Sequence, residues 1–227
     1  MTQTIPARNI ELYSLQDKFG LERCHDPKFF PEWQQAIAPI NEADQETLNA
    51  IKTEFNYLSN RPILEAMVKM VVVSPLLRLA GFYRSPFFMA AEKEIRITSK
   101  DEDLEISGRL NLLVFSPEFW LLCIETKSVQ YSIEVGIPQI LTYMLGMMEH
   151  QQQGYGMVTN GTDFIFVKCD RGTDTTPPRY ALSDGYSLRK QKNELIDVLQ
   201  ILRALAQQAI ANTITNQTSN NSDAEHQ

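Results

Sequence analysis

The spacing of hydrophobic positions changes along the chain, and each change predicts an element. Over residues 41–58 the apolar residues recur at the three- and four-residue spacing of one helix face, at Leu48, Ile51, Phe55 and Leu58. The same spacing returns over residues 62–81. Prolines at 62 and 75 and a glycine at 81 predict a helix that begins near Pro62, kinks or restarts at Pro75 and ends at Gly81.

The pattern then becomes extended. Residues 91–98 (AEKEIRIT) alternate, and a charged turn (SKDED) follows them. Two apolar runs come next, at residues 110–115 and 119–124, with Ser-Pro-Glu between them. Near-continuous apolar runs of this length are typical of strands buried on both faces. Residues 92–127 are therefore predicted to form a three-stranded antiparallel meander, whose last strand ends in Glu125-Thr126-Lys127.

Beyond the meander the helical spacing resumes. Residues 137–150 predict a helix with a methionine-rich face, and the Asn160-Gly161 pair within residues 154–168 predicts a β-hairpin. A short run at 180–182 and a long amphipathic helix over 187–210 follow. A helix between the third strand and the next one indicates a crossover connection, so we expect an α/β (α+β) fold with a mixed central sheet flanked by helices.

Composition sets the expected domain organisation. The 227 residues fit one domain, which we place at 41–210. Prolines punctuate residues 1–40, which predicts an irregular arm with a short helix near 33–37. We expect this arm to pack as a strap over the core, and an appendage that contacts a partner is the alternative. Residues 211–227 are rich in Asn, Ser, Thr and Gln and are expected to be a disordered tail.

Charge and cysteine content narrow the function classes. The formal net charge of −7 argues against a protein that coats nucleic acid, although a local basic groove remains compatible with it. Three widely spaced cysteines do not form a disulfide framework, and no zinc-ligand spacing accompanies Cys24-His25. No apolar run is long enough to cross a membrane and no signal peptide is visible, so a cytoplasmic protein is expected.

The end of the third meander strand carries the candidate chemistry. Glu125 and Lys127 lie two residues apart on a strand, which places them on one face, about 6–7 Å apart. A carboxylate at that position can hold a divalent metal while the amine orients or polarises an attacking water. The alternative is a solvated strand end with a weak surface ion pair.

These motifs together resemble the PD-(D/E)XK nucleases, and more narrowly the N-terminal nuclease region of type I restriction enzyme R subunits and related stand-alone proteins. The resemblance spans roughly residues 54–168. It rests on a helical glutamate before LLRLAGF, the strand GRLNLLV, the IETK triplet, the helix segment QILTY and the turn VTNG. It implies a restriction-endonuclease-like fold.

The resemblance also implies a site. Glu125 and the residue at position 111 would bind Mg²⁺ or Mn²⁺, and Lys127 would orient water or stabilise charge on the phosphate. Glu65 would be a supporting acid, and Gln139 would contact the lysine, the water or a backbone phosphate. The partner would be DNA, contacted by Arg109 and Tyr143, with further protein partners or a homo-oligomer possible. An ordinary helix surface is the alternative for Gln139 and Tyr143.

One residue departs from the family pattern. The family places a metal-binding aspartate two residues after the Arg of a Gly-Arg pair, and this chain has Asn111 there. An amide offers an oxygen but no charge, so metal binding should weaken. Three interpretations stay open: the site works with Asn111 and help from Glu65, Asp103 or Glu105 supplies the carboxylate, or cleavage has been lost.

Two functions follow from these interpretations. The first is a metal-dependent endodeoxyribonuclease or nuclease subunit of restriction-modification or DNA processing. The second is a catalytically impaired nuclease-fold protein that binds nucleic acid or another protein, with a small basic patch at Arg96, Lys100, Arg109 and Lys127. A small-molecule enzyme is a distant third, because no Ser-His-Asp arrangement, Cys-His arrangement or dinucleotide fingerprint is visible. No Gly-x-x-x-x-Gly-Lys phosphate loop is present either.

Overall fold

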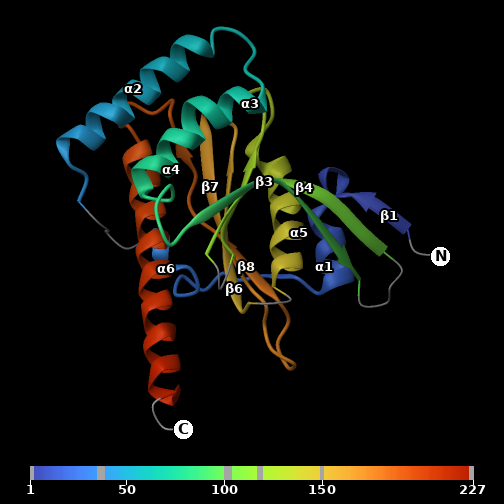
Figure 1. Ribbon diagram of the computed structural model, residues 1–227. Coiled ribbons are helices and arrows are strands. Elements are labelled where there is room, and N and C mark those ends of the chain that lie inside the picture. The colour runs from blue at the N-terminus through green and yellow to red at the C-terminus, as the bar shows by residue number, and fades with distance from the viewer. Residues whose placement is uncertain (1–2, 35–38, 100–103, 117–119, 149–150, 225–227) are drawn as a thin grey trace.

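A mixed β-sheet forms the centre of the computed structural model, which describes residues 3–34, 39–99, 104–116, 120–148 and 151–224 (Figure 1). Within these residues nine strands form one sheet in the order β1-β4-β5-β6-β7-β8-β2, and β3 also pairs with β4 and β9 with β7. The strands are β1 (Gln3–Pro6), β2 (Glu22–Arg23), β3 (Phe88–Thr98), β4 (Leu104–Phe115), β5 (Trp120–Thr126), β6 (Gln153–Thr159), β7 (Asp163–Asp170), β8 (Arg179–Leu182) and β9 (Tyr186–Ser187).

The predicted meander and crossover are both confirmed. Strands β3, β4 and β5 pair antiparallel in sequence order. Helix α5 (Ile137–Met147) then carries the chain across, so that β6 pairs parallel to β5. Strands β6 and β7 form the predicted hairpin. The fold class expected from the sequence, a mixed central sheet flanked by helices, is therefore the observed one.

Helices cover the sheet on both faces (Figure 1). The core on one face is shared with α2 (Glu42–Leu58), α4 (Ser74–Ala80) and α6 (Leu195–Ala224). The core on the other face is shared with α5 and with α1 (Leu12–Phe19), a helix that the sequence analysis missed. Short turns complete the chain: η1 (Ala7–Asn9), η2 (Pro31–Trp33) and η4 (Ile133–Gly136).

Local capping explains why the predicted helices begin and end where they do. The Asn41 side chain accepts from the backbone N–H of Asp44, and the Asp44 carboxylate accepts from the backbone N–H of Asn41, which is a capping box at the start of α2. Gly81 ends α4 in the left-handed conformation, at a φ of +95°. The helix boundaries are thus encoded by neighbouring residues.

The helical run before Gly81 is less regular than its apolar spacing predicts. It starts as α3 (Glu65–Val68), three residues after Pro62, and continues as a π-helical turn, η3 (Lys69–Val73), into α4. Pro75 has no N–H to donate to the carbonyl of Val71, so an ordinary α-helical ladder is interrupted there. The widened turn lies directly before this proline, where a kink was predicted.

The observed structure near the two ends of the chain also differs from the structure that the sequence predicted. Residues 3–34 add β1 and β2 to the sheet, whereas an irregular arm was expected there. Part of the expected short helix, residues 35–38, lies outside the described residues, as do 100–103 of the charged turn and 149–150 at the end of the helix predicted over 137–150.

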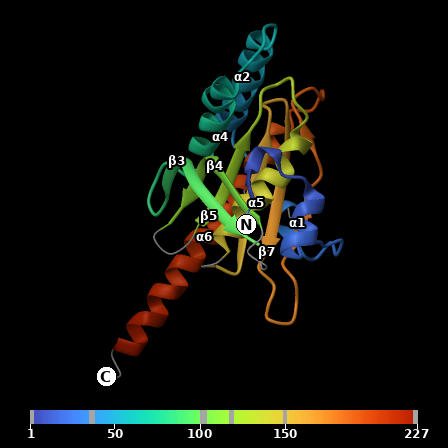
Figure 2. The same cartoon turned by 90° about the vertical axis from the view of Figure 1, so that its right-hand side faces the viewer.

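The last helix, α6, begins at Leu195, later than predicted, because β9 and a turn precede it. It continues to Ala224, through the segment expected to be disordered, where no glycine or proline interrupts it. Its C-terminal half projects beyond the rest of the molecule (Figures 1 and 2). The proposed domain boundaries at 40 and 210 stay predictions. None of the helices in the described ranges combines the length and hydropathy that a bilayer-spanning helix needs.

Candidate active site

The candidate site lies where β4 and β5 separate. The antiparallel pairing of β4 with β5 ends at Leu112 and Ile124, whereas the parallel pairing of β5 with β6 continues through Glu125 and Thr126. Asn111 bridges the gap. Its Oδ1 accepts from the backbone N–H of Thr126 at 2.8 Å and from the Thr126 hydroxyl at 2.6 Å. The amide thus replaces a main-chain contact between the diverging strands.

A chain of hydrogen bonds links β5 to α5. The Lys127 ammonium donates to Glu125 Oε1 at 2.9 Å and to Gln139 Oε1 at 2.6 Å. Gln139 Nε2 donates to the Tyr143 hydroxyl at 2.8 Å, and that hydroxyl donates to the backbone carbonyl of Arg109 at 3.1 Å. Glu125 lies near the end of β5 and Lys127 directly follows this strand, while helical spacing places Gln139 and Tyr143 on the same face of α5. The structure therefore brings together four of the predicted residues.

This network is buried. The side chains of Lys127 and Glu125 are 12% and 1% exposed, so they do not form the solvated surface pair that was the alternative interpretation. Gln139 and Tyr143 are also buried, so they do not lie on a solvent-exposed surface of the helix, which was the alternative for them. Tyr143 positions Gln139 through its hydroxyl group. It is only 1% exposed, so the direct contact with nucleic acid that was predicted for it does not fit this structure. Interactions that hold a lysine in one orientation are the kind that catalytic sites require.

The Glu125 carboxylate has a pKa well above its ordinary value. Burial raises its pKa to about 7, against the lowering influence of Lys127, and the charge of Glu65 raises it further. Within the described part of the chain, Glu125 Oε2 is buried without a hydrogen-bond partner. A buried carboxylate oxygen without a partner is a costly arrangement unless something else satisfies it.

Close packing fixes the start of α5 against these side chains. A Cβ on Gly136 would lie 2.6 Å from Val158 Cγ1 and 3.3 Å from Lys127 Cε. The absence of a side chain at Gly136 thus lets the first turn of α5 approach β5 and β6. That approach carries Gln139 to within hydrogen-bond distance of Lys127.

The remaining predicted residues have different placements. Glu65 is half-buried in the first turn of α3, and its charge acts on Glu125. The Arg109 side chain is exposed. Glu105 pairs with Thr98 of β3 and Thr4 of β1, six residues before Asn111 on β4, and Asp103 lies outside the described residues. Of the predicted acids Glu65, Asp103 and Glu105, Glu65 is therefore the one whose charge is seen to act on Glu125.

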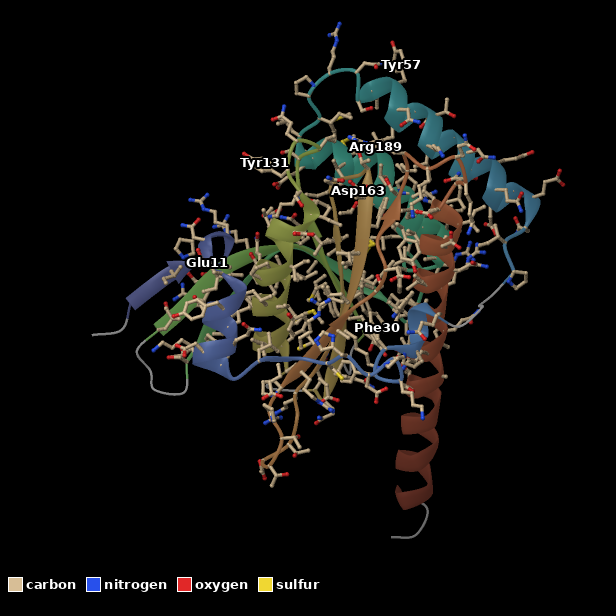
Figure 3. The ribbon with its side chains drawn as sticks, turned by 180° about the vertical axis from the view of Figure 1, so that it is seen from behind. Glu11, Phe30, Tyr57, Tyr131, Asp163 and Arg189 are labelled. Atoms are coloured by element: carbon tan, nitrogen blue, oxygen red, sulfur yellow. The ribbon has the colours of Figure 1, made fainter. Side chains whose placement is uncertain are left out.

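The loop after Lys127 borders the site. The Asn160 side chain donates to the carbonyl of Tyr131 at 2.9 Å, which ties this loop to the hairpin turn between β6 and β7. The Tyr131 ring is exposed, and Figure 3 shows it at the same end of the molecule as Asp163 and Arg189. An exposed aromatic side chain and a basic one thus flank this end of the sheet.

The residues present can hold a divalent cation only with help from solvent or substrate. Among the described residues no group of three or more His, Cys, Asp or Glu side chains converges on one point. The Asn111 oxygen is already used by Thr126, which leaves Glu125 Oε2 and Glu65 as donors. Magnesium commonly takes one or two carboxylates and completes its shell with water and phosphate oxygens, so this donor set fits it.

Two features of the site have no signal in the sequence pattern. Thr126 was quoted within the Glu-Thr-Lys triplet, but nothing in the pattern indicated its contact with Asn111. Glu92 stands across β4 from the site, on β3, and has a left-handed φ of +53°. A strand pattern such as AEKEIRIT contains no signal for that conformation.

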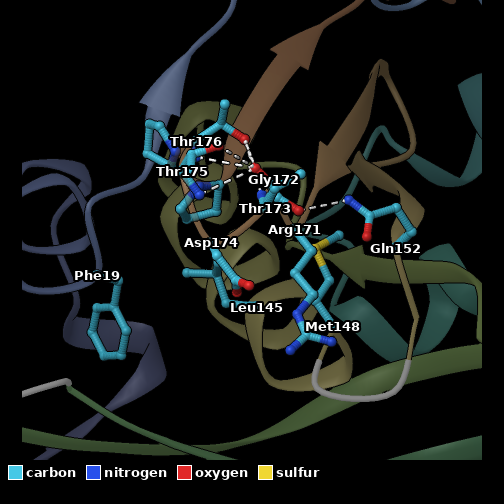
Figure 4. Close-up of a pocket in the computed structure, with 12 residues that line it drawn as sticks. Phe19, Leu145, Met148, Gln152, Arg171, Gly172, Thr173, Asp174, Thr175 and Thr176 are labelled. Atoms are coloured by element: carbon cyan, nitrogen blue, oxygen red, sulfur yellow. Dashed lines mark hydrogen bonds between the residues drawn. The ribbon is translucent and has the colours of Figure 1, made fainter.

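Another cavity lies away from this site. A hollow of about 780 Å³ is lined by residues 171–178, Phe19 and the end of α5 at Leu145 and Met148 (Figure 4). Threonine hydroxyls 173, 175 and 176 hydrogen-bond one another in this loop. Gln139 is in the first turn of α5, so this cavity belongs to the opposite end of that helix and takes no part in the Glu125 network.

Comparison with solved structures gives a distant structural similarity. No protein-family model matches the chain, and no curated protein matches it. Among solved structures it is similar to a fragment assigned to an HsdR subunit of a type I restriction enzyme from Vibrio vulnificus YJ016, with 18% sequence identity and a TM-score of 0.36. The match covers 46% of this chain and 21% of that one, so the chain spans about a fifth of the structure it matches.

Proposed function

We propose that this protein is a magnesium-dependent nuclease that hydrolyses phosphodiester bonds in DNA. One observation carries the proposal. A buried glutamate, Glu125, has one oxygen on Lys127 and the other without a partner among the described residues, and Lys127 is itself held by Gln139. This pairing of a carboxylate with an oriented ammonium is what a metal-assisted hydrolysis needs.

Each residue of the network has a distinct part in this function. A bound Mg²⁺ would polarise the scissile phosphate and lower the pKa of a bound water. Glu125 Oε2 and Glu65 would hold that ion. Lys127 has three N–H donors, and Glu125 and Gln139 take two, so one remains for the attacking water or a phosphate oxygen. Gln139 and Tyr143 keep the ammonium in place.

The test is a cleavage assay on single- and double-stranded DNA with Mg²⁺ or Mn²⁺. Lys127→Met should reduce cleavage by about 100-fold or more, because electrostatic stabilisation by one oriented group is commonly of that size. The matched control is Lys28→Met, which removes an exposed lysine and should cleave like the wild type. Undiminished cleavage by Lys127→Met would refute the assigned role of the lysine.

A second function is favoured by a specific observation on Asn111. Both acceptor positions of its oxygen are used by Thr126, so position 111 contributes no charge and no free oxygen to a cation. A protein of this kind would bind DNA or a partner protein without cutting. In that case the wild type would not cleave, and Asn111→Asp, which retains an acceptor for Thr126, would restore cleavage.

A further inference from the structure

Three neighbouring strands place Glu92, Asn111 and Glu125 in one line. Ala91 pairs with Leu112 and Lys93 with Leu110, so Glu92 stands opposite Asn111 across β3 and β4. The pairing of Leu112 with Ile124 places Asn111 level with Glu125 on β5. Adjacent paired strands are about 4.8 Å apart and β4 and β5 diverge at this level, so the backbones of the two glutamates are separated by roughly 10 Å or more.

At this level of the sheet, the regular alternation of side chains between the two faces is interrupted in both β3 and β4. On β4, Leu110 belongs to the core beneath α5, whereas Leu112 packs against the core on the other face. On β3, Ile95 faces the α5 side, whereas Met89 packs against the opposite core. Glu92, the one non-glycine residue with positive φ among the described residues, lies at the point of reversal. The local twist thus takes Glu92 out of the regular alternation.

The Glu92 carboxylate contacts one part of the site and acts electrostatically on another. Its Oε1 accepts from Lys69 Nζ at 3.1 Å, and Lys69 lies one helical turn after Glu65. Burial raises the pKa of Tyr143 to about 12, and the charges of Glu125 and Glu92 contribute to that increase. Glu92 therefore lies within electrostatic reach of the network on α5 while contacting the helical run that carries Glu65.

We propose that Glu92 is the carboxylate that compensates for Asn111, by leaving Lys69 and binding the divalent cation held at Glu125. The inference rests on the proposed function. Glu125 Oε2, buried and without a partner among the described residues, is the independent sign that a cation belongs here. Among the described residues these carboxylates do not converge on one point, and Glu92 pairs with Lys69 instead.

The exchange is electrostatically reasonable. The Lys69 and Glu92 side chains are 31% and 53% exposed, and an ion pair with that much solvent contact contributes little stability. A divalent cation carries twice the charge of the ammonium that it would replace. Once released, Lys69 would be available to a phosphate of the substrate on the same side of the site.

The test is a titration with Mn²⁺ alone. Binding is measured by electron paramagnetic resonance, as a decrease in the signal of the free ion. Glu92→Gln should raise the Kd about tenfold or more, because it removes one charged ligand. The matched control is Glu94→Gln, an exposed glutamate on the same strand that pairs with Arg96, and it should bind like the wild type. Circular dichroism establishes that each variant is folded.

A second variant predicts a change of opposite sign. Lys69→Met removes the cation that competes for Glu92, so it should tighten Mn²⁺ binding severalfold, whereas Lys93→Met should not. If Glu125→Gln abolishes binding while Glu92→Gln binds like the wild type, the inference about Glu92 is overturned and the proposed site at Glu125 stands. If the wild type does not bind Mn²⁺, both are overturned.

Discussion

At the scale of single residues, the account depends on the environment of Glu125. The carboxylate is buried, shares one oxygen with Lys127 and has no partner for the other among the described residues. The sequence predicted Glu125, Lys127 and Gln139 as a group because their types and spacing carry the chemistry. It could not predict that Tyr143 is buried, or that Glu92 faces Asn111, because burial and strand register depend on contacts between distant segments.

The raised pKa of Glu125 makes stability depend on pH. The pKa is about 7 in the folded protein against 4.5 ordinarily, so between these values the folded state keeps a proton that the unfolded state has lost. The free energy of unfolding should therefore fall as pH rises through this window, by on the order of 3 kcal/mol in total. Urea unfolding of wild type and Glu125→Gln at pH 4.5 and pH 8 measures it. A difference between them that does not change with pH would contradict the assignment.

At the scale of elements, local signals predicted the framework well. The Asn160-Gly161 pair predicted the hairpin, and the structure shows how the two residues form its turn. The Asn160 side chain accepts from the backbone N–H groups of Thr162 and Asp163, and Gly161 adopts a φ of +85°. The π-helical turn before Pro75 and the reversal of faces in β3 and β4 were not predictable. Both break the periodicity on which sequence interpretation relies.

Gly161 should tolerate no side chain. Its positive φ disfavours other residues, and a Cβ there would lie 2.6 Å from the Phe55 ring. Gly161→Ala should therefore lower the free energy of unfolding by about 2–4 kcal/mol, from backbone strain and overpacking together. Gly185→Ala is the control, since a Cβ there meets nothing within 4 Å. Equal urea midpoints for the two variants would show that the turn does not need glycine.

At the scale of the whole molecule, one ion pair joins helices that are far apart in sequence. Arg203 of α6 donates from two nitrogens to the Asp44 carboxylate of α2, at 2.7 and 2.8 Å, and also donates to the carbonyl of Leu79. The hydrogen bond from Arg203 lowers the pKa of Asp44. The pair thus holds the three helices over one face of the sheet, which a sequence pattern does not reveal.

Removing this arginine should destabilise the protein. Arg203→Met leaves the buried Asp44 without its ion-pair partner and should lower the free energy of unfolding by about 2–4 kcal/mol at pH 7. Because the pKa of Asp44 is lowered in the folded state, the difference from wild type should shrink as pH falls below the ordinary value of 3.8. Arg189→Met, at an exposed position, is the control for urea unfolding. A loss of stability as small as that of the control would refute the role of the pair.

The most direct test of the central claim is calorimetric titration of Mg²⁺ into the wild type and Glu125→Gln at pH 8, above the pKa of about 7 at which Glu125 ionises. We predict a saturable binding isotherm for the wild type that is absent in Glu125→Gln, while both proteins keep the same circular dichroism spectrum. Identical isotherms for the two proteins, or no binding by either, would contradict the claim that Glu125 holds a metal ion.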